Sequence, residues 1–126
     1  MHELAICESV LGQVLALAET HKANRVGRIL LTIGPLAGVE PHLLLNAFPL
    51  VAAGSLCEGS EIQIETAAVR VECNLCGASS GAQPNRLLCA ACGTWRVALV
   101  SGDEMLLSSV ELFEHDRKQI GEKIHV

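Results

Sequence analysis

The sequence predicts an α+β fold, in which a small antiparallel or mixed sheet packs with two helices and a four-cysteine module is inserted. Three observations lead to this prediction. Apolar residues recur at the helical period in two segments, strand-like runs follow each of them, and the composition changes abruptly over residues 73–93. This last stretch contains four cysteines and three glycines and has little periodicity. Strand character returns after it, so we expect the final long strand to rejoin the first sheet.

Two segments have the pattern of amphipathic helices. Leu4 to about Lys22 carries apolar residues at helical spacing among good helix formers. Glu40 to Ala53 is the second helix, with Pro41 suited to its first turn. Pro49 interrupts this second pattern, and a proline inside a helix removes a backbone hydrogen bond at a cost of about 3 kcal/mol. We therefore expect a kink or an early end there.

Four segments have the pattern of strands. Arg25 to Ile33 is rich in apolar and β-branched residues, so its burial is expected on nearly both faces. Glu61 to Glu65 alternates strictly and predicts a strand with one polar face. Strand character is found again from Trp95 to Val100 and from Leu106 to Phe113. Residues 119–126 are expected to form a flexible tail.

Size and charge limit the classes of function. A chain of 126 residues and 13.4 kDa suits one domain with a small insert. Its net charge of −5 disfavours nucleic acid as a partner, because an acidic chain repels phosphates. The sequence shows no uninterrupted apolar run long enough to cross a bilayer and no secretory signal, so we expect no membrane association and a cytoplasmic location.

The inserted module contains two copies of the pattern CxxCG. Cys73 and Cys76 form the first pair, Cys89 and Cys92 form the second, and twelve residues separate the two copies. Zn²⁺ prefers four tetrahedral ligands and binds thiolate sulfur well, and a two-residue spacer lets both sulfurs of a pair face one ion. Four protein ligands leave no open position, so the module is predicted to be a zinc ribbon with a structural ion.

Other interpretations of the cysteines are weaker. Four thiolates would also accept a rubredoxin-type iron, which the sequence does not exclude. A redox-active pair needs only one CxxC and does not account for two copies. The module has few basic residues and one aromatic residue, which is a poor footprint for nucleic acid. Cys7 and Cys57 lie in apolar stretches and are expected to be buried, inert thiols.

The first three residues form a possible chelate for a second metal. The amino group of Met1, the amide nitrogen of His2 and the imidazole of His2 are three nitrogen donors, and Glu3 can add its backbone nitrogen or its carboxylate. Methionine before a bulky residue is generally retained, which keeps the histidine in second position. Nitrogen donors in a plane suit Ni²⁺ or Cu²⁺.

The order of these features resembles the HypA/HybF family of nickel metallochaperones, which act in the maturation of [NiFe]-hydrogenase. The resemblance runs from residue 1 to about residue 113. It rests on Met1-His2-Glu3, the first helix, the segment Ile33-Gly34-Pro35-Leu36-Ala37-Gly38-Val39-Glu40-Pro41, the pair Ala47-Phe48, the double CxxCG module and the segment Ser101-Gly102-Asp103-Glu104.

The resemblance implies a role for each of the two sites. Nickel would bind His2 with Met1 and Glu3, and zinc would bind the four cysteines of the ribbon. The protein would then be a nickel carrier without catalytic activity. Its expected partners are a nickel-handling GTPase of hydrogenase maturation and the hydrogenase large subunit.

The predicted organisation has three parts, and the chain is expected to be a monomer or a weak homodimer. Residues 1–70 together with 101–118 would form the nickel-binding domain, residues 71–100 the zinc ribbon and residues 119–126 the tail. Two rival functions stay open. A zinc-ribbon adaptor would bind protein or nucleic acid without nickel, and a purely structural subunit would use its zinc to stabilise an interface.

Overall fold

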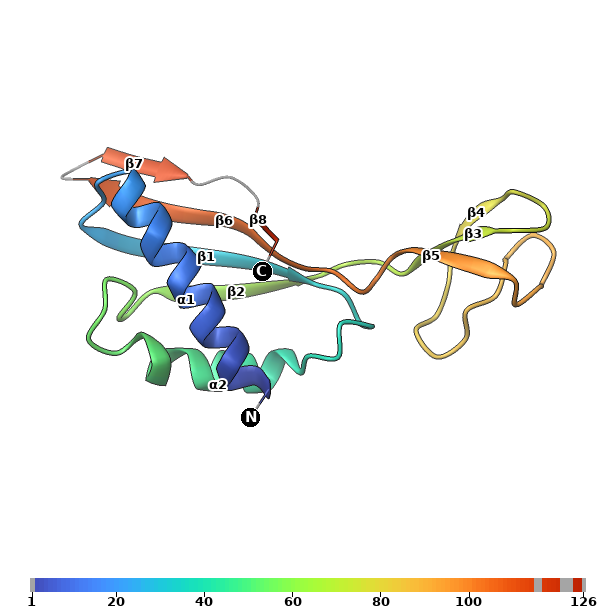
Figure 1. Cartoon of the computed structure of the whole chain (residues 1–126), viewed down its shortest axis with the longest axis horizontal. Helices are drawn as coiled ribbons and strands as arrows, with labels where there is room; N and C mark the ends of the chain where they lie inside the picture. Colours follow the sequence, from blue (N-terminus) through green and yellow to red (C-terminus); the bar gives the residue numbers. More distant parts are fainter. Residues whose placement is uncertain (1, 115–116, 121–123, 126) are drawn as a thin grey trace.

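The structure of the protein is a computed structural model that describes residues 2–114, 117–120 and 124–125. Figure 1 shows a body of two helices and a larger sheet, from one end of which a small second sheet projects. The elements in chain order are α1 (His2–Thr20), β1 (Arg25–Ile33), α2 (Pro41–Ala52), β2 (Glu61–Thr66), β3 (Arg70–Cys73), β4 (Ser79–Gly81), β5 (Val97–Ser101), β6 (Met105–Glu114), β7 (Arg117–Ile120) and β8 (Ile124–His125). The predicted α+β class, with a mixed sheet and two helices, is confirmed.

The larger sheet is built around β1. This strand pairs in parallel with β2 and antiparallel with β6, and β6 also pairs with β7 and β8. Parallel neighbours need a crossover, and α2 supplies it between β1 and β2. The expectation that the last long strand rejoins the first sheet is confirmed, because β6 pairs with β1 from Arg25 to Ile33.

Both helices bury their apolar residues against one face of this sheet. In α2, Leu44, Phe48 and Ala52 are buried at four-residue spacing, so they lie on one side of the helix. The core that they share with α1 and the sheet consists of Ile6, Cys7, Val10, Val14, Ala18, Val26, Ile29, Leu31, Ile33, Cys57, Leu107, Val110 and Leu112. Aliphatic side chains dominate it, with Phe48 as its one aromatic residue among the buried residues that the structure describes.

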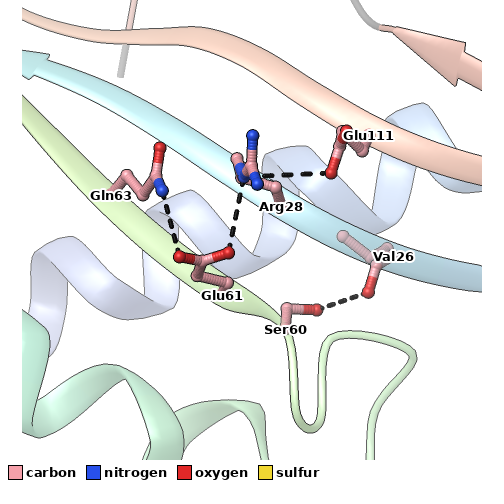
Figure 2. Close-up of polar contacts among 6 residues, drawn as sticks. All are labelled: Val26, Arg28, Ser60, Glu61, Gln63 and Glu111. Atoms are coloured by element: carbon pink, nitrogen blue, oxygen red, sulfur yellow. Dashed lines mark hydrogen bonds and ion pairs between the residues drawn. The ribbon is translucent and has the colours of Figure 1, made fainter.

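The opposite face of the sheet carries charged side chains. Arg28 on β1 lies between two carboxylates, with its Nε 3.4 Å from Glu61 on β2 and 4.0 Å from Glu111 on β6 (Figure 2). The prediction that β1 is buried on nearly both faces was therefore wrong, since fully buried residues alternate with exposed or half-buried ones. Because both helices lie on one side, the fully buried residues of β1 (Val26, Ile29, Leu31 and Ile33) belong to the core on that side. Glu61–Thr66 has the polar face that was predicted.

The second helix passes through Pro49 and ends at Ala52, so the early end that we considered does not occur. Pro49 lies on the exposed side of α2, between the buried Phe48 and Ala52. The carbonyl of Leu45, which loses its usual helical donor, belongs to that same exposed side. Burial of Leu44, Phe48 and Ala52 in the core keeps α2 helical on both sides of Pro49.

The smaller sheet has the order β4-β3-β5, with both pairings antiparallel. We did not predict β3 and β4, because short strands in a cysteine-rich segment have no clear period. Val71 in the central strand is fully buried, but the ribbon has few other buried apolar residues. So small a core rarely folds without a metal or disulfides.

The two sheets meet where the backbones of Gly34 and Gly102 touch. The amide of Leu36 donates to the carbonyl of Gly102 at 2.7 Å, and the amide of Gly34 donates to the carbonyl of Glu104 at 2.8 Å. A Cβ atom on Gly34 would overlap the Gly102 carbonyl group. This contact ties the chain that leaves the ribbon to the loop that follows β1.

The segment expected to be a tail contains the end of β7 and all of β8, whereas residues 121–123 and 126 lie outside the described residues. Among the helices that the structure describes, none is long and apolar enough to cross a membrane.

Candidate metal centres

Each CxxCG pair forms a tight turn that directs backbone amides at sulfur. In the first turn, the amides of Leu75 and Cys76 each lie 3.3 Å from the Sγ of Cys73. The second turn repeats this geometry, with the amide of Cys92 3.4 Å from the Sγ of Cys89. Each turn closes on a glycine of positive φ (75° and 76°), which is why glycine follows each pair.

The four sulfurs converge from the two turns. All four Sγ atoms lie within 4.8 Å of one another, and the Cys73–Cys92 and Cys76–Cys89 pairs are each 3.6 Å apart. A tetrahedral zinc ion with Zn–S bonds of about 2.3 Å would separate its sulfurs by roughly 3.8 Å. The donor set therefore fits one zinc ion with four protein ligands, and no position is left for a substrate. The predicted four-cysteine metal site is present.

The first cysteine of each pair is poised to be a thiolate. Backbone amides, that of Cys76 above all, lower the pKa of the Cys73 thiol to about 6. The amide of Cys92 likewise lowers the pKa of Cys89. The amide of Ala78 favours the Cys76 thiolate, but the adjacent sulfurs of Cys73 and Cys89 outweigh it and raise the pKa of Cys76 to about 11. Four thiolates so close together need a cation to neutralise their repulsion.

Cys7 and Cys57 take no part in this cluster. Both are buried in the core of the body, as predicted. Burial raises the pKa of Cys7, and burial raises that of Cys57 to about 11, although Ser55 opposes the effect by a hydrogen bond. Both side chains are therefore neutral thiols, and the Sγ of Cys7 donates to the carbonyl of Leu44 at 3.6 Å.

The start of α1, which carries the predicted nickel ligands His2 and Glu3, lies beside α2 on the body (Figure 1). Met1 is outside the described residues, as is the side chain of His2, whose backbone begins α1. The carboxylate of Glu3 is described: its Oε2 accepts a hydrogen bond of 3.3 Å from the amide of Glu40, at the start of α2. Among the described residues, the cluster of possible metal ligands contains the four cysteines and does not include Glu3.

A pocket that the sequence did not reveal lies next to this N-terminal segment. It has a volume of about 400 Å³ and is lined by Glu3, Leu4, Leu43, Asn46, Ala47 and Leu50. The one sequence signal for this pocket is the helical spacing of Leu43, Ala47 and Leu50 in α2. However, α2 is apolar on several sides, so its sequence does not distinguish the core side from the outer side.

A two-helix α+β body that carries a closed four-thiolate ribbon is a metal-binding protein whose ribbon ion is structural. The family described as "Hydrogenase/urease nickel incorporation, metallochaperone, hypA" matches residues 1–112. The chain therefore belongs to the HypA family of metallochaperones.

Two similar sequences and one similar solved structure agree with this assignment. The chain is 45% identical to the hydrogenase maturation factor HypA of Nitrosospira multiformis, over 89% of this chain and 97% of that protein. It is 38% identical to the factor of the same name from Chlorobium limicola, over 92% of this chain and all of that protein. The solution structure of the Ni metallochaperone HypA from Helicobacter pylori shares the fold, with a TM-score of 0.67 at 24% identity over 88% of this chain and 97% of that one.

Proposed function

We propose that this protein binds Ni(II) at its N-terminus and helps to insert it into the large subunit of [NiFe]-hydrogenase. The family match over residues 1–112 carries the proposal, because it includes the Met1-His2-Glu3 segment and names nickel incorporation. The ligands would be the amino group of Met1, the amide and imidazole nitrogens of His2, and the backbone nitrogen of Glu3. The four ribbon cysteines would hold zinc throughout.

The start of α1 favours the use of backbone nitrogens. The first four amides of an α-helix have no partner within the helix, and those of His2 and Glu3 are among them. Coordination of nickel by these nitrogens would therefore cost no helical hydrogen bond. The positive end of the helix dipole also favours loss of protons from the amine, yet it repels the cation itself. We expect moderate affinity from these opposing effects.

The contact of Glu3 decides which of its donors we assign. Its carboxylate accepts from the amide of Glu40 and lies close to the start of α2, where a negative charge is stabilising. Moving it to nickel would break that contact. We therefore assign the Glu3 backbone nitrogen to nickel and give its carboxylate the role of holding the N-terminal segment against α2.

A carrier must bind its cargo and also release it. A chelate at the chain terminus can exchange its ligands one by one, whereas the closed cysteine cage would release its ion slowly. We propose that a nickel-handling GTPase of hydrogenase maturation acts with this protein in the cytoplasm. No catalytic step is assigned to the chain.

A nickel titration of untagged protein tests the proposal, with zinc and nickel content measured beforehand. Wild type should bind one nickel, and His2→Ala should bind none, while both keep one zinc. His42→Ala is the matched control, because His42 is an exposed histidine near the start of α2. Glu3→Gln should keep nickel binding within a few-fold if the backbone nitrogen is the donor. Affinity should fall as the pH is lowered from about 8 to 6, since amine and imidazole nitrogens must lose protons to bind.

The rival functions predict different results. Equal nickel binding by wild type and His2→Ala would refute the N-terminal site and favour a zinc-ribbon adaptor. A nickel affinity that does not change with pH would also count against these ligands. Loss of nickel in the Glu3→Gln variant would show that its carboxylate is a ligand.

A further inference from the structure

The last two strands of the larger sheet run along one edge of β6. Both pair with it in the antiparallel sense, β7 at Glu111–Glu114 and β8 at Leu106 and Leu107. The two pairings keep one register, because the step along β6 from one to the other equals the step along the paired chain. Figure 1 shows β7 beside β6. We call β7 and β8 together the C-terminal segment, and it covers both ends of this edge.

The C-terminal segment lies beyond the part of the chain that matches the family. The family match ends at residue 112, and the segment begins at Arg117. Without it, β6 would be the last strand on its side of the sheet, because the strand order is β2-β1-β6-β7. The backbone amides and carbonyls along that side of β6 would then have no strand to pair with. Such an edge is a template for association with another strand.

The uncovered edge of β6 would suit a second copy of the same strand. This strand is ten residues long and mostly apolar, and its carboxylates, Glu111 and Glu114, lie near its end. In an antiparallel two-fold pairing centred on the Ser108–Ser109 step, Glu111 of one copy faces Leu106 of the other. Within the strand, no carboxylate then faces another. Charge therefore does not oppose this pairing.

The opposite edge of the sheet, at β2, is protected in a different way. Glu61, Gln63 and Glu65 are exposed at alternate positions of this strand. In an antiparallel pairing of two β2 strands centred on Gln63, Glu61 of one copy faces Glu65 of the other. Like charges directly opposite each other are destabilising. The side chains of β2 thus discourage self-pairing, whereas β6 lacks alternating charges and is covered by the C-terminal segment instead.

From these observations we infer that the edge of β6 is an interaction surface for β6 of a second copy, and that the C-terminal segment blocks it. The chain's own strands occupy the hydrogen-bonding positions that a second copy would use. They therefore keep the protein monomeric. The inference stands apart from the proposed function, because none of the assigned nickel ligands belongs to β6, β7 or β8.

The test measures self-association of full-length variants by sedimentation equilibrium. Alternate residues of a strand direct their amides to the same neighbour, so one of the amides of Lys118 and Gln119 points at β6. The variant Lys118→Pro/Gln119→Pro removes that amide and weakens the cover. It should self-associate more tightly than wild type by about tenfold or more, because a long edge becomes available. Lys118→Ala/Gln119→Ala is the matched control, since it keeps both amides and should behave as wild type does.

A further substitution and hydrogen exchange locate the interface. Ser109→Glu, added to the proline variant, should return it to a monomer, because the carboxylates of the two copies would lie close together beside the two-fold axis. Hydrogen exchange should show that protection of the β6 amides in the proline variant rises with protein concentration. Protection that rises elsewhere but not in β6 would overturn the inference.

Other outcomes would also overturn it. One is a proline variant that stays monomeric while it keeps its zinc and its helical circular dichroism signal. A second is a dimer that Ser109→Glu does not dissociate, and a third is a wild-type dimer as tight as that of the proline variant. If the proline variant loses its helical signal, Ile124→Pro/His125→Pro exposes the end of the edge beside β8 and allows the same comparison.

Discussion

Replacement of Gly34 by alanine should destabilise the protein strongly, although glycine to alanine is a small change. Gly34 packs against the backbone of Gly102, and an added Cβ would overlap the Gly102 carbonyl and lie 2.7 Å from the amide of Asp103. These neighbours are backbone atoms, which cannot rotate away as a flexible side chain can. The two chain segments must therefore move apart.

The cost can be worked out from the contacts that would be lost. Separation breaks the hydrogen bonds from Leu36 to Gly102 and from Gly34 to Glu104, which measure 2.7 and 2.8 Å. Each hydrogen bond is worth about 1 kcal/mol. Displaced packing at Val69, which lies beside Gly102, adds about 1 kcal/mol more. We expect the free energy of unfolding to fall by about 3 kcal/mol, which corresponds to a drop in Tm on the order of 10 °C.

Urea unfolding followed by circular dichroism measures this loss, with zinc content determined in parallel. Gly12→Ala is the control, because Gly12 lies in α1 with nothing within 4 Å of its added Cβ. That change should raise stability by up to about 1 kcal/mol, since alanine is the better helix former. A Gly34→Ala protein as stable as wild type would refute the packing argument for the junction.

Two further predictions concern the cysteines. Cys73→Ser should lower bound zinc well below one per chain while the helical circular dichroism signal of the body remains. Cys7→Ala is the control and should leave the zinc content unchanged. Full zinc retention by Cys73→Ser would contradict the four-thiolate site. The pKa of Cys57 is raised to about 11 in the folded protein, so the folded state keeps a proton that the unfolded state loses above about pH 9. Stability should therefore fall as the pH rises from about 9 to 11, and urea unfolding should show a smaller fall for Cys57→Ala than for wild type. Equal slopes for the two proteins would mean that burial does not shift this thiol.

The sequence was informative where chemistry depends on local spacing. The CxxCG pairs place two sulfurs and a permissive glycine within five residues, so the geometry of each turn follows from its own residues. The strict alternation of Glu61–Glu65 and the apolar period of α1 likewise indicate which side of each element faces the core. For this reason the four-cysteine cluster and the α+β class could be predicted before any tertiary contact was known.

Other features depended on which elements become neighbours. Arg25–Ile33 has an apolar composition that suits burial on both faces, and only the placement of both helices on one side explains why Arg28 is exposed opposite Glu61. Pro49 is tolerated because packing of Phe48 and Ala52 outweighs the loss of one helical hydrogen bond on the exposed side.

The sequence by itself determined the metal-binding turns, the main helices and strands, and the resemblance to nickel metallochaperones, because these depend on residues close together in the chain. Only the tertiary structure showed that Glu3 reaches the start of α2, that Gly34 meets Gly102, and that Leu50 lies in an exposed groove. Each of these contacts joins residues more than thirty positions apart. Chain folding brings such residues together through the packing of whole elements, and no local pattern records that packing.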